Sequence, residues 1–166
     1  MLREHLIALT ARVEILPGLA EQAFIDIDSL LRPVYGHAKQ GASYGHTKIA
    51  GRQILRKGLS PLATTLSTAD STPIITGMRL RAGKAGSGKG AGRMVTQAIV
   101  TARTAGATGA LVVRGDSAYG TRSVISHACA RRCASRSSWP RTPRPTRDRL
   151  DPRRRVDPGE ISRCRA

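Results

Sequence analysis

The sequence predicts an α/β domain built on a mixed sheet, in which antiparallel first strands precede a β-α-β crossover. Two apolar, β-favouring segments each end in an aspartate, at Asp28 and Asp116. Further strand-like segments lie between them, and an amphipathic helical pattern comes just before the second aspartate. At 166 residues the chain has room for one ordinary domain.

The N-terminal part predicts a short helix and a first strand. Residues 2–15 place apolar side chains at helical spacing until Pro17 and Gly18 end the pattern. In residues 23–28, AFIDID, apolar residues alternate with acids, as in a strand that carries Asp26 and Asp28 on one face.

The central part predicts further strands. Residues 35–51 mix Gly, Tyr, His and Lys, which suits a second strand and turn whose small residues allow close approach of the backbone. Residues 62–66 and 74–80 are β-like runs joined by the turn-rich STADSTP. We expect these two runs to be antiparallel neighbours.

The crossover is predicted from a helix followed by a buried strand. Residues 91–105 carry an apolar stripe at helical spacing, and Gly106 ends the helix. Residues 110–113 are continuously apolar, as in a central strand, and Asp116 follows them. A second helix begins near Thr121. Both aspartates therefore lie at strand ends, where open α/β sheets build their sites.

Charge is distributed unevenly along the chain. Residues 1–130 carry 16 basic and 7 acidic side chains, a net +9, whereas residues 131–166 carry 12 basic and 4 acidic, a net +8. The total of +17 predicts a polyanionic partner, most simply DNA. Residues 131–166 contain too few apolar side chains to bury a core, so we expect them to be disordered.

Two origins of this C-terminal composition stay open. The tail could be a basic arm that contacts DNA phosphates. Its basic residues are all arginine, however, and the composition changes abruptly inside a predicted helix. We favour the second origin, in which a GC-rich gene is read out of frame and the chain is truncated after about residue 128.

Several classes of site and location are disfavoured. Cys129, Cys133 and Cys164 form no CxxC pair, and the four histidines show no metal-ligand spacing. No apolar run reaches the roughly 18 to 20 residues of a membrane span, and a signal-peptide pattern is absent. We expect a cytoplasmic protein.

The two strand-end aspartates suit a site for Mg²⁺ or Mn²⁺, because hard divalent cations prefer oxygen ligands. The alternative is that each aspartate only caps a turn. Asp26 competes with Asp28 for the first ligand position, since it lies on the same strand face. We rank Asp28 first because it is nearer the strand end and Ser29 follows it.

The segment FIDIDSLLRPVYGHAKQGASYGHTKIAG resembles the first catalytic-aspartate region of DDE-type bacterial insertion-sequence transposases, which have an RNase H-like core. In that family an aspartate ends the first strand and Ser or Thr follows, as Asp28 and Ser29 do here. Leu30 stands where Thr is usual.

The segment GALVVRGDSAYG resembles the second catalytic-aspartate region of the same family. The similarity covers about residues 17 to 128. The pattern R-x-D-S-x-[FY] is matched here by Arg114, Asp116, Ser117 and Tyr119. The resemblance implies a partial RNase H-like fold, with Asp28 and Asp116 as catalytic and metal-binding residues.

The resemblance also implies features that the sequence lacks. The family has a third carboxylate, a glutamate far downstream, and nothing here matches it, since Glu160 lies in the arginine-rich tail. We therefore expect a transposase fragment that is catalytically inactive alone, although intact relatives cleave and transfer DNA strands with Mg²⁺ or Mn²⁺. Intact relatives also act as assemblies, so a homo-oligomer is possible.

Candidate DNA contacts are Lys39, Tyr44, Lys48 and Arg114. Together with Tyr35, the residues Lys39, Tyr44 and Lys48 form a basic and aromatic patch that suits an unpaired DNA end; the alternative for each tyrosine is a packed position in the core. The glycine-rich residues 83–90 follow a strand and precede a helix, the context of a phosphate-binding loop. Gly90 lacks the hydroxyl that would hold Mg²⁺, so a flexible basic loop or a solvated turn is the better interpretation.

The expected organisation has three parts: an N-terminal helix and linker (1–22), a partial transposase core (23–130) and a disordered Arg/Pro-rich tail (131–166). The alternative function is that of a small, non-enzymatic, basic nucleic-acid-binding protein that acts through the tail.

Overall fold

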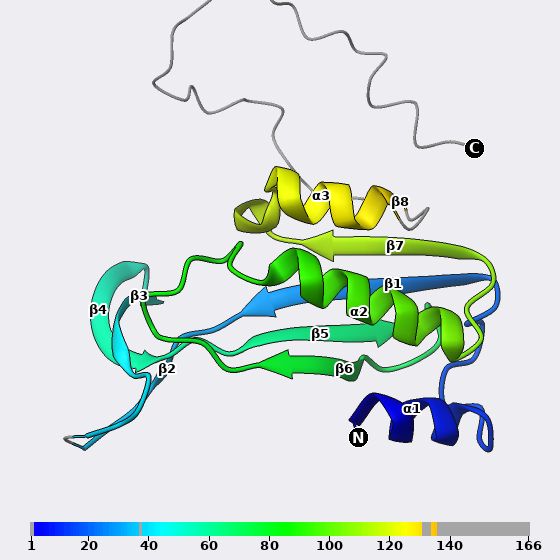
Figure 1. The fold of residues 1–166 in the computed structure, drawn as a ribbon, viewed down its shortest axis with the longest axis horizontal. Coiled ribbons are helices and arrows are strands. Elements are labelled where there is room, and N and C mark those ends of the chain that lie inside the picture. The colour runs from blue at the N-terminus through cyan, green and yellow to red at the C-terminus, as the bar shows by residue number, and fades with distance from the viewer. Residues whose placement is uncertain (1, 37, 131–133, 136–166) are drawn as a thin grey trace, which may run out of the picture.

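The computed structural model describes residues 2–36, 38–130 and 134–135 (Figure 1). Its helices are α1, α2 and α3, with one 3₁₀ turn, and its strands fall into two sheets. The elements in chain order are α1 (Leu2–Thr10), β1 (Gln22–Ser29), β2 (Arg32–Pro33), β3 (Ser43–Ile49), β4 (Arg52–Leu59), β5 (Leu62–Ser67), β6 (Ile74–Arg79), α2 (Ala91–Thr104), β7 (Ala110–Gly115), the 3₁₀ turn (Ser117–Tyr119), α3 (Arg122–Cys129) and β8 (Ala134–Ser135).

The main sheet is mixed and has the order β6-β5-β1-β7-β8. β1 pairs antiparallel with β5, and β5 antiparallel with β6. The chain then crosses over through α2, so that β7 pairs parallel with β1 on its other side. The predicted mixed α/β sheet, with antiparallel first strands followed by a β-α-β crossover, is confirmed.

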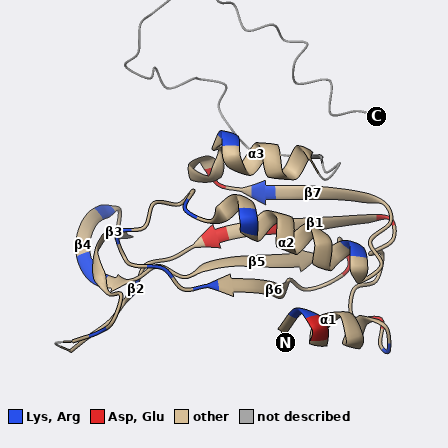
Figure 2. Ribbon diagram, viewed as in Figure 1, with Lys and Arg blue, Asp and Glu red and all other residues tan. Residues whose placement is uncertain are grey.

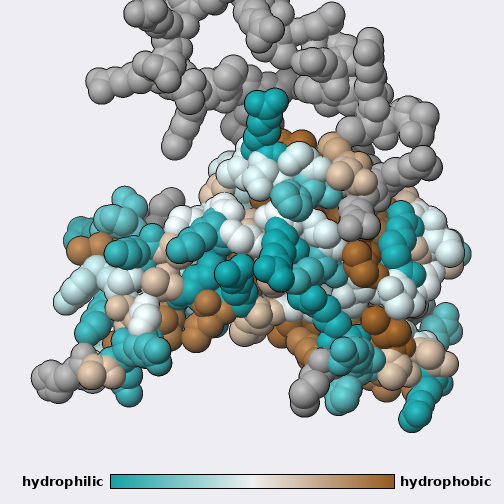
Figure 3. Space-filling view, viewed as in Figure 1, coloured by the Kyte–Doolittle hydropathy of each residue, from teal (hydrophilic) through white to brown (hydrophobic). Residues whose placement is uncertain are grey.

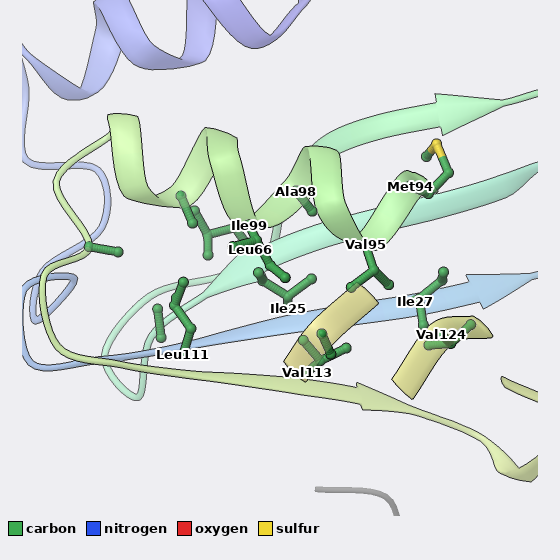
Figure 4. Packing of buried hydrophobic residues seen from close by; sticks show 14 of the residues in the cluster. Ile25, Ile27, Leu66, Met94, Val95, Ala98, Ile99, Leu111, Val113 and Val124 are labelled. Carbon is green, nitrogen blue, oxygen red and sulfur yellow. The ribbon is translucent and has the colours of Figure 1, made fainter. Parts of the chain in front are cut away.

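The core lies between this sheet and α2 (Figure 4). Alternate residues of β1 point toward the helix, because successive side chains of a strand face opposite sides. Ile25 is fully buried and Ile27 nearly so, and they pack among residues of α2 such as Val95 and Ile99. Each such side chain contributes roughly 2 kcal/mol through burial. The same alternation turns Asp26 away from α2.

A small second sheet, of order β2-β4-β3, extends from one end of the main sheet (Figure 1). It consists mainly of the hairpin of β3 and β4, joined by a turn with positive φ at Ala50 and Gly51. The sequence predicts a strand and turn within residues 35–51, but its pattern indicates neither β4 nor a separate sheet. This part of the prediction was incomplete.

The predicted N-terminal helix was too long. α1 ends at Thr10, and the chain turns so that Leu16 and Leu19 are buried in the core. Apart from residues 35–51, the other helix and strand boundaries differ from expectation by one or two residues. None of the helices in the described part of the chain is long and apolar enough to cross a membrane.

The predicted tail lies outside the described residues, except for Ala134 and Ser135, which pair parallel with β7 as β8. The boundaries proposed at residues 22 and 130, and the disorder expected of residues 131–166, stay predictions.

Candidate functional site

Asp28 and Asp116 lie at neighbouring strand ends. In the parallel pairing of β1 with β7, Ile27 is the partner of Gly115, and each aspartate is the next residue along its chain. Adjacent strands are about 4.8 Å apart. The topology therefore brings two carboxylates, separated by almost ninety residues of sequence, to one edge of the sheet.

Both aspartates also bond to nearby backbone. Oδ1 of Asp28 accepts the amide N–H of Ser29 at 2.6 Å. Oδ1 of Asp116 accepts the amide N–H of Ala118 at 2.9 Å and caps the 3₁₀ turn. The turn-capping role considered for these residues is thus present at Asp116. Both residues remain exposed.

A tyrosine links the two strand ends. Tyr119, in the 3₁₀ turn after β7, is 2% exposed and packs in the core. Its hydroxyl donates to Oγ of Ser29 at the end of β1, at 2.7 Å. Gly115 lies beside the ring, where a Cβ would come within 3.3 Å of the tyrosine Cβ. The serine and tyrosine of the two sequence motifs therefore contact each other.

Burial and nearby charges both act on the pKa of the Tyr119 hydroxyl. Burial raises the pKa of the Tyr119 phenol, and the negative charges of Asp28 and Asp116 raise it as well. The hydrogen bond with Ser29 and the charge of Arg81 act in the opposite direction on this pKa. The charges of both aspartates thus affect the pKa of this phenol.

Asp26 has a different partner. Its carboxylate accepts two hydrogen bonds from Arg114 on β7, from Nε at 2.7 Å and from a terminal guanidinium nitrogen at 2.8 Å. This bidentate contact raises the pKa of Arg114. The guanidinium also lies 4.3 Å from the ring centroid of Phe24. Asp26 is therefore engaged within the sheet, whereas no described residue forms a salt bridge with Asp28.

The two strand-end carboxylates fit a divalent cation. Mg²⁺ is commonly held by one or two carboxylates and completes its coordination with water. Among the described residues, no group of three or more His, Cys, Asp or Glu side chains is placed to hold a metal ion. The donor set found in this part of the chain is thus a pair of carboxylates.

The candidate DNA contacts occupy two places. Tyr44 and Lys48 belong to β3, and Lys39 is exposed in the loop before it. Arg114 lies on the main sheet, where Asp26 uses two of its N–H groups. The first three residues therefore belong to the hairpin region, and Arg114 is separate from it.

The glycine-rich loop between β6 and α2 is organised around Arg81, which is only 7% exposed. One guanidinium nitrogen donates to the carbonyls of Gly86, Ser87 and Lys89. The others donate to the carbonyl and hydroxyl of Ser60. The loop thus directs carbonyl oxygens at a buried cation, whereas a phosphate-binding loop directs N–H groups at an anion.

Arg81 was not identified from the sequence. Arginine is seldom buried, and no local pattern distinguishes it from the exposed Arg79 two residues earlier. Only the folded loop brings its carbonyl partners together.

Comparison with known proteins gives distant structural matches alone. No family model matches the chain, and neither does any curated protein. The Mos1 strand transfer complex is 14% identical, with a TM-score of 0.33 over 81% of this chain and 39% of that one. The Mos1 transposase paired-end complex with left transposon end is 12% identical, with a TM-score of 0.34 over 81% and 40%. The chain spans about two fifths of the length of those chains.

Proposed function

We propose that the chain carries part of a DDE-type insertion-sequence transposase core, of RNase H-like class, in which Asp28 and Asp116 bind Mg²⁺ or Mn²⁺. The observation that carries the proposal is the parallel pairing of β1 and β7, which ends in these two aspartates. The sequence motifs around both residues match the family pattern, and their serine and tyrosine contact each other.

When bound, a divalent cation would activate a water or 3′-hydroxyl and stabilise the leaving oxygen in phosphodiester transfer. Asp28 and Asp116 would hold it, since their oxygens are the ligands that such cations prefer. Tyr119 would act as a positioning residue by fixing the end of β1 against the turn after β7. The net charge of +17 suits a DNA substrate.

Metal binding can be tested by titrating the protein with Mn²⁺ and following the enhancement of water-proton relaxation. We expect Asp28→Asn and Asp116→Asn each to weaken Mn²⁺ binding at least tenfold. Asp26→Asn is the matched control, because that carboxylate already bonds to Arg114. Loss of binding in Asp26→Asn, with Asp28→Asn unchanged, would reverse the assignment. Wild-type protein that binds no Mn²⁺ would refute the proposed site.

Catalysis requires a separate assay. We expect the chain alone not to cleave DNA, because the family uses three carboxylates and two are identified here. Supercoiled plasmid incubated with the protein and Mg²⁺ or Mn²⁺ should stay supercoiled. Nicking that is abolished by Asp28→Ala would show that the chain is an active nuclease.

A further inference from the structure

The hairpin Ser43–Leu59 has two faces with different surroundings. In its antiparallel register Tyr44 is the partner of Lys57, and His46 the partner of Leu55. Directly paired residues lie on the same face. These four residues therefore share one face, which we call the outer face. The residues between them, including Gly45 and Arg56, belong to the inner face.

The inner face packs against the rest of the domain at its base. A Cβ built on Gly45 would overlap the carbonyl of Gly83, and one on Gly58 would overlap that of Arg32. Both would also come within 3.3 Å of the side chain of Leu31. These close approaches fix which side of the hairpin faces the domain and hold it in a defined position.

The outer face exposes side chains that a folded domain usually covers. Tyr44 is 63% exposed and Leu55 is 55% exposed, and His46 is exposed between them in sequence. Lys57 is the residue paired with Tyr44 across the hairpin. An exposed ring and an exposed apolar side chain thus share one face with a half-buried cation.

The charge of this region is of one sign. Residues 29–69 contain six Lys and Arg, namely Arg32, Lys39, Lys48, Arg52, Arg56 and Lys57, and no Asp or Glu. The positive positions follow the hairpin in Figure 2, and Figure 3 shows a mostly hydrophilic surface there with apolar residues interspersed. Such a surface attracts an anionic partner.

We propose that the outer face binds an unpaired segment of a DNA strand, with a base stacked on Tyr44 and the backbone phosphates near Lys57. The identification of the strand as DNA rests on the proposed function. A stacking platform within a positive surface is the general mode of single-strand binding. Paired bases in a duplex do not offer their faces to a side chain, so the exposed ring favours a single strand.

The test uses the full chain and a single-stranded deoxyoligonucleotide that contains 2-aminopurine, whose fluorescence is quenched on stacking. We expect quenching by the wild-type protein and by Tyr44→Phe. Tyr44→Ala and Tyr44→Leu should bind this strand about tenfold more weakly and lose most of the quenching. Tyr44→Leu keeps an apolar side chain without a ring, so it separates stacking from general burial. Thermal melting checks that each variant is folded.

Two matched comparisons sharpen the result. Lys57→Ala and Arg56→Ala remove one positive charge each from adjacent positions on opposite faces, and Lys57→Ala should weaken binding more. The duplex form of the oligonucleotide should show little quenching.

The inference would be overturned if Tyr44→Ala quenched as strongly as the wild type. It would also be overturned if Lys57→Ala and Arg56→Ala lost equal affinity, or if duplex and single strand were quenched equally. Stronger quenching of the corresponding ribonucleotide strand would overturn the assignment to DNA. Stacking without Mn²⁺ binding would refute the proposed metal site alone, whereas Mn²⁺ binding without stacking would refute the hairpin inference alone.

Discussion

Tyr119 is the residue through which the two aspartate-bearing strand ends contact each other. Its hydroxyl reaches Ser29 across ninety positions of sequence, and its buried ring belongs to the core. Packing in the core fixes the ring, and the hydrogen bond then fixes the end of β1 relative to the 3₁₀ turn that Asp116 caps. The geometry of the candidate site thus depends on packing as well as on the acids.

Replacement of Tyr119 by phenylalanine tests this link. The ring and its packing are kept, while the hydrogen bond to Ser29 is lost, so we expect the free energy of unfolding to fall by about 1 kcal/mol. Mn²⁺ affinity should fall as well, because the two strand ends are less firmly held. Urea denaturation and Mn²⁺ titration measure the two effects. Lost stability with unchanged Mn²⁺ affinity would limit Tyr119 to a structural role.

The same tyrosine predicts a pH dependence of stability. Its pKa is raised in the folded state, chiefly by burial, above the ordinary value of about 10. The folded chain therefore holds the phenolic proton more tightly than the unfolded chain does. This contribution to stability is complete below about pH 10 and is lost as the pH rises further. The difference in unfolding free energy between wild type and Tyr119→Phe should therefore narrow above pH 10, and a difference that widens there would contradict the assignment.

At Asp26 and Asp28 the sequence could identify candidates without separating their environments. Strand alternation puts both on one face, and both lie near the strand end. What differs is the neighbouring strand, since the register places Arg114 opposite Asp26. That register depends on the crossover and cannot be obtained from local pattern. The preference for Asp28 as the metal ligand stays a prediction until metal binding is measured.

Among the elements, the loop between β6 and α2 depends on a single buried arginine. Arg81→Met would leave loop carbonyls and Ser60 without their donor, so we expect a loss of about 2 to 4 kcal/mol in unfolding free energy. Arg81→Lys should restore little of it, because an ammonium cannot reproduce the planar fork. Arg79→Met, at an exposed neighbouring position, is the control. Limited trypsin digestion should cut faster after Lys84 and Lys89 in Arg81→Met, and unchanged cleavage would mean that the loop is held by other contacts.

The hairpin depends on glycine at the points where its backbone meets the domain. Gly45→Ala should cost about 1 to 3 kcal/mol, because the added methyl group overlaps the carbonyl of Gly83. Gly86→Ala is the matched control, since nothing lies within 4 Å of a Cβ at that position. Thermal melting compares the two variants. Equal melting temperatures would show that the hairpin base can shift without cost.

The hairpin was also the element that sequence patterning predicted least well. β4, RQILRKGL, has four exposed and three half-buried positions, and its one buried residue is Gly58. A strand that buries no side chain on either face has little reason to alternate apolar and polar residues, so the usual period of two is absent. β1, α2 and β7 bury a regular set of apolar side chains, and their patterns were correspondingly clear.

At the scale of the whole molecule, the order of elements was enough to predict the class of sheet. Once β5 and β6 were expected to be antiparallel and α2 to lead into β7, the crossover returned the chain parallel to an earlier strand. Sequence order did not indicate that residues between β1 and β5 would leave the main sheet. Because β2, β3 and β4 are inserted between β1 and β5, the strand predicted within residues 35–51 belongs to the second sheet and not to the main sheet.

The distribution of charge allows the core and the C-terminal segment to be tested as competing DNA-binding elements. Deleting residues 136–166 keeps β8 and removes ten arginines and four acids, which lowers the net charge from +17 to +11. If the core and hairpin bind DNA, the shortened chain should keep measurable affinity. A plot of the logarithm of affinity against the logarithm of salt concentration should have a shallower slope, because fewer phosphates are neutralised. Fluorescence anisotropy at several salt concentrations measures both quantities. If the shortened chain is folded and all affinity is lost, the alternative of a basic protein that acts through its arginine-rich tail would replace the transposase-core proposal for DNA binding.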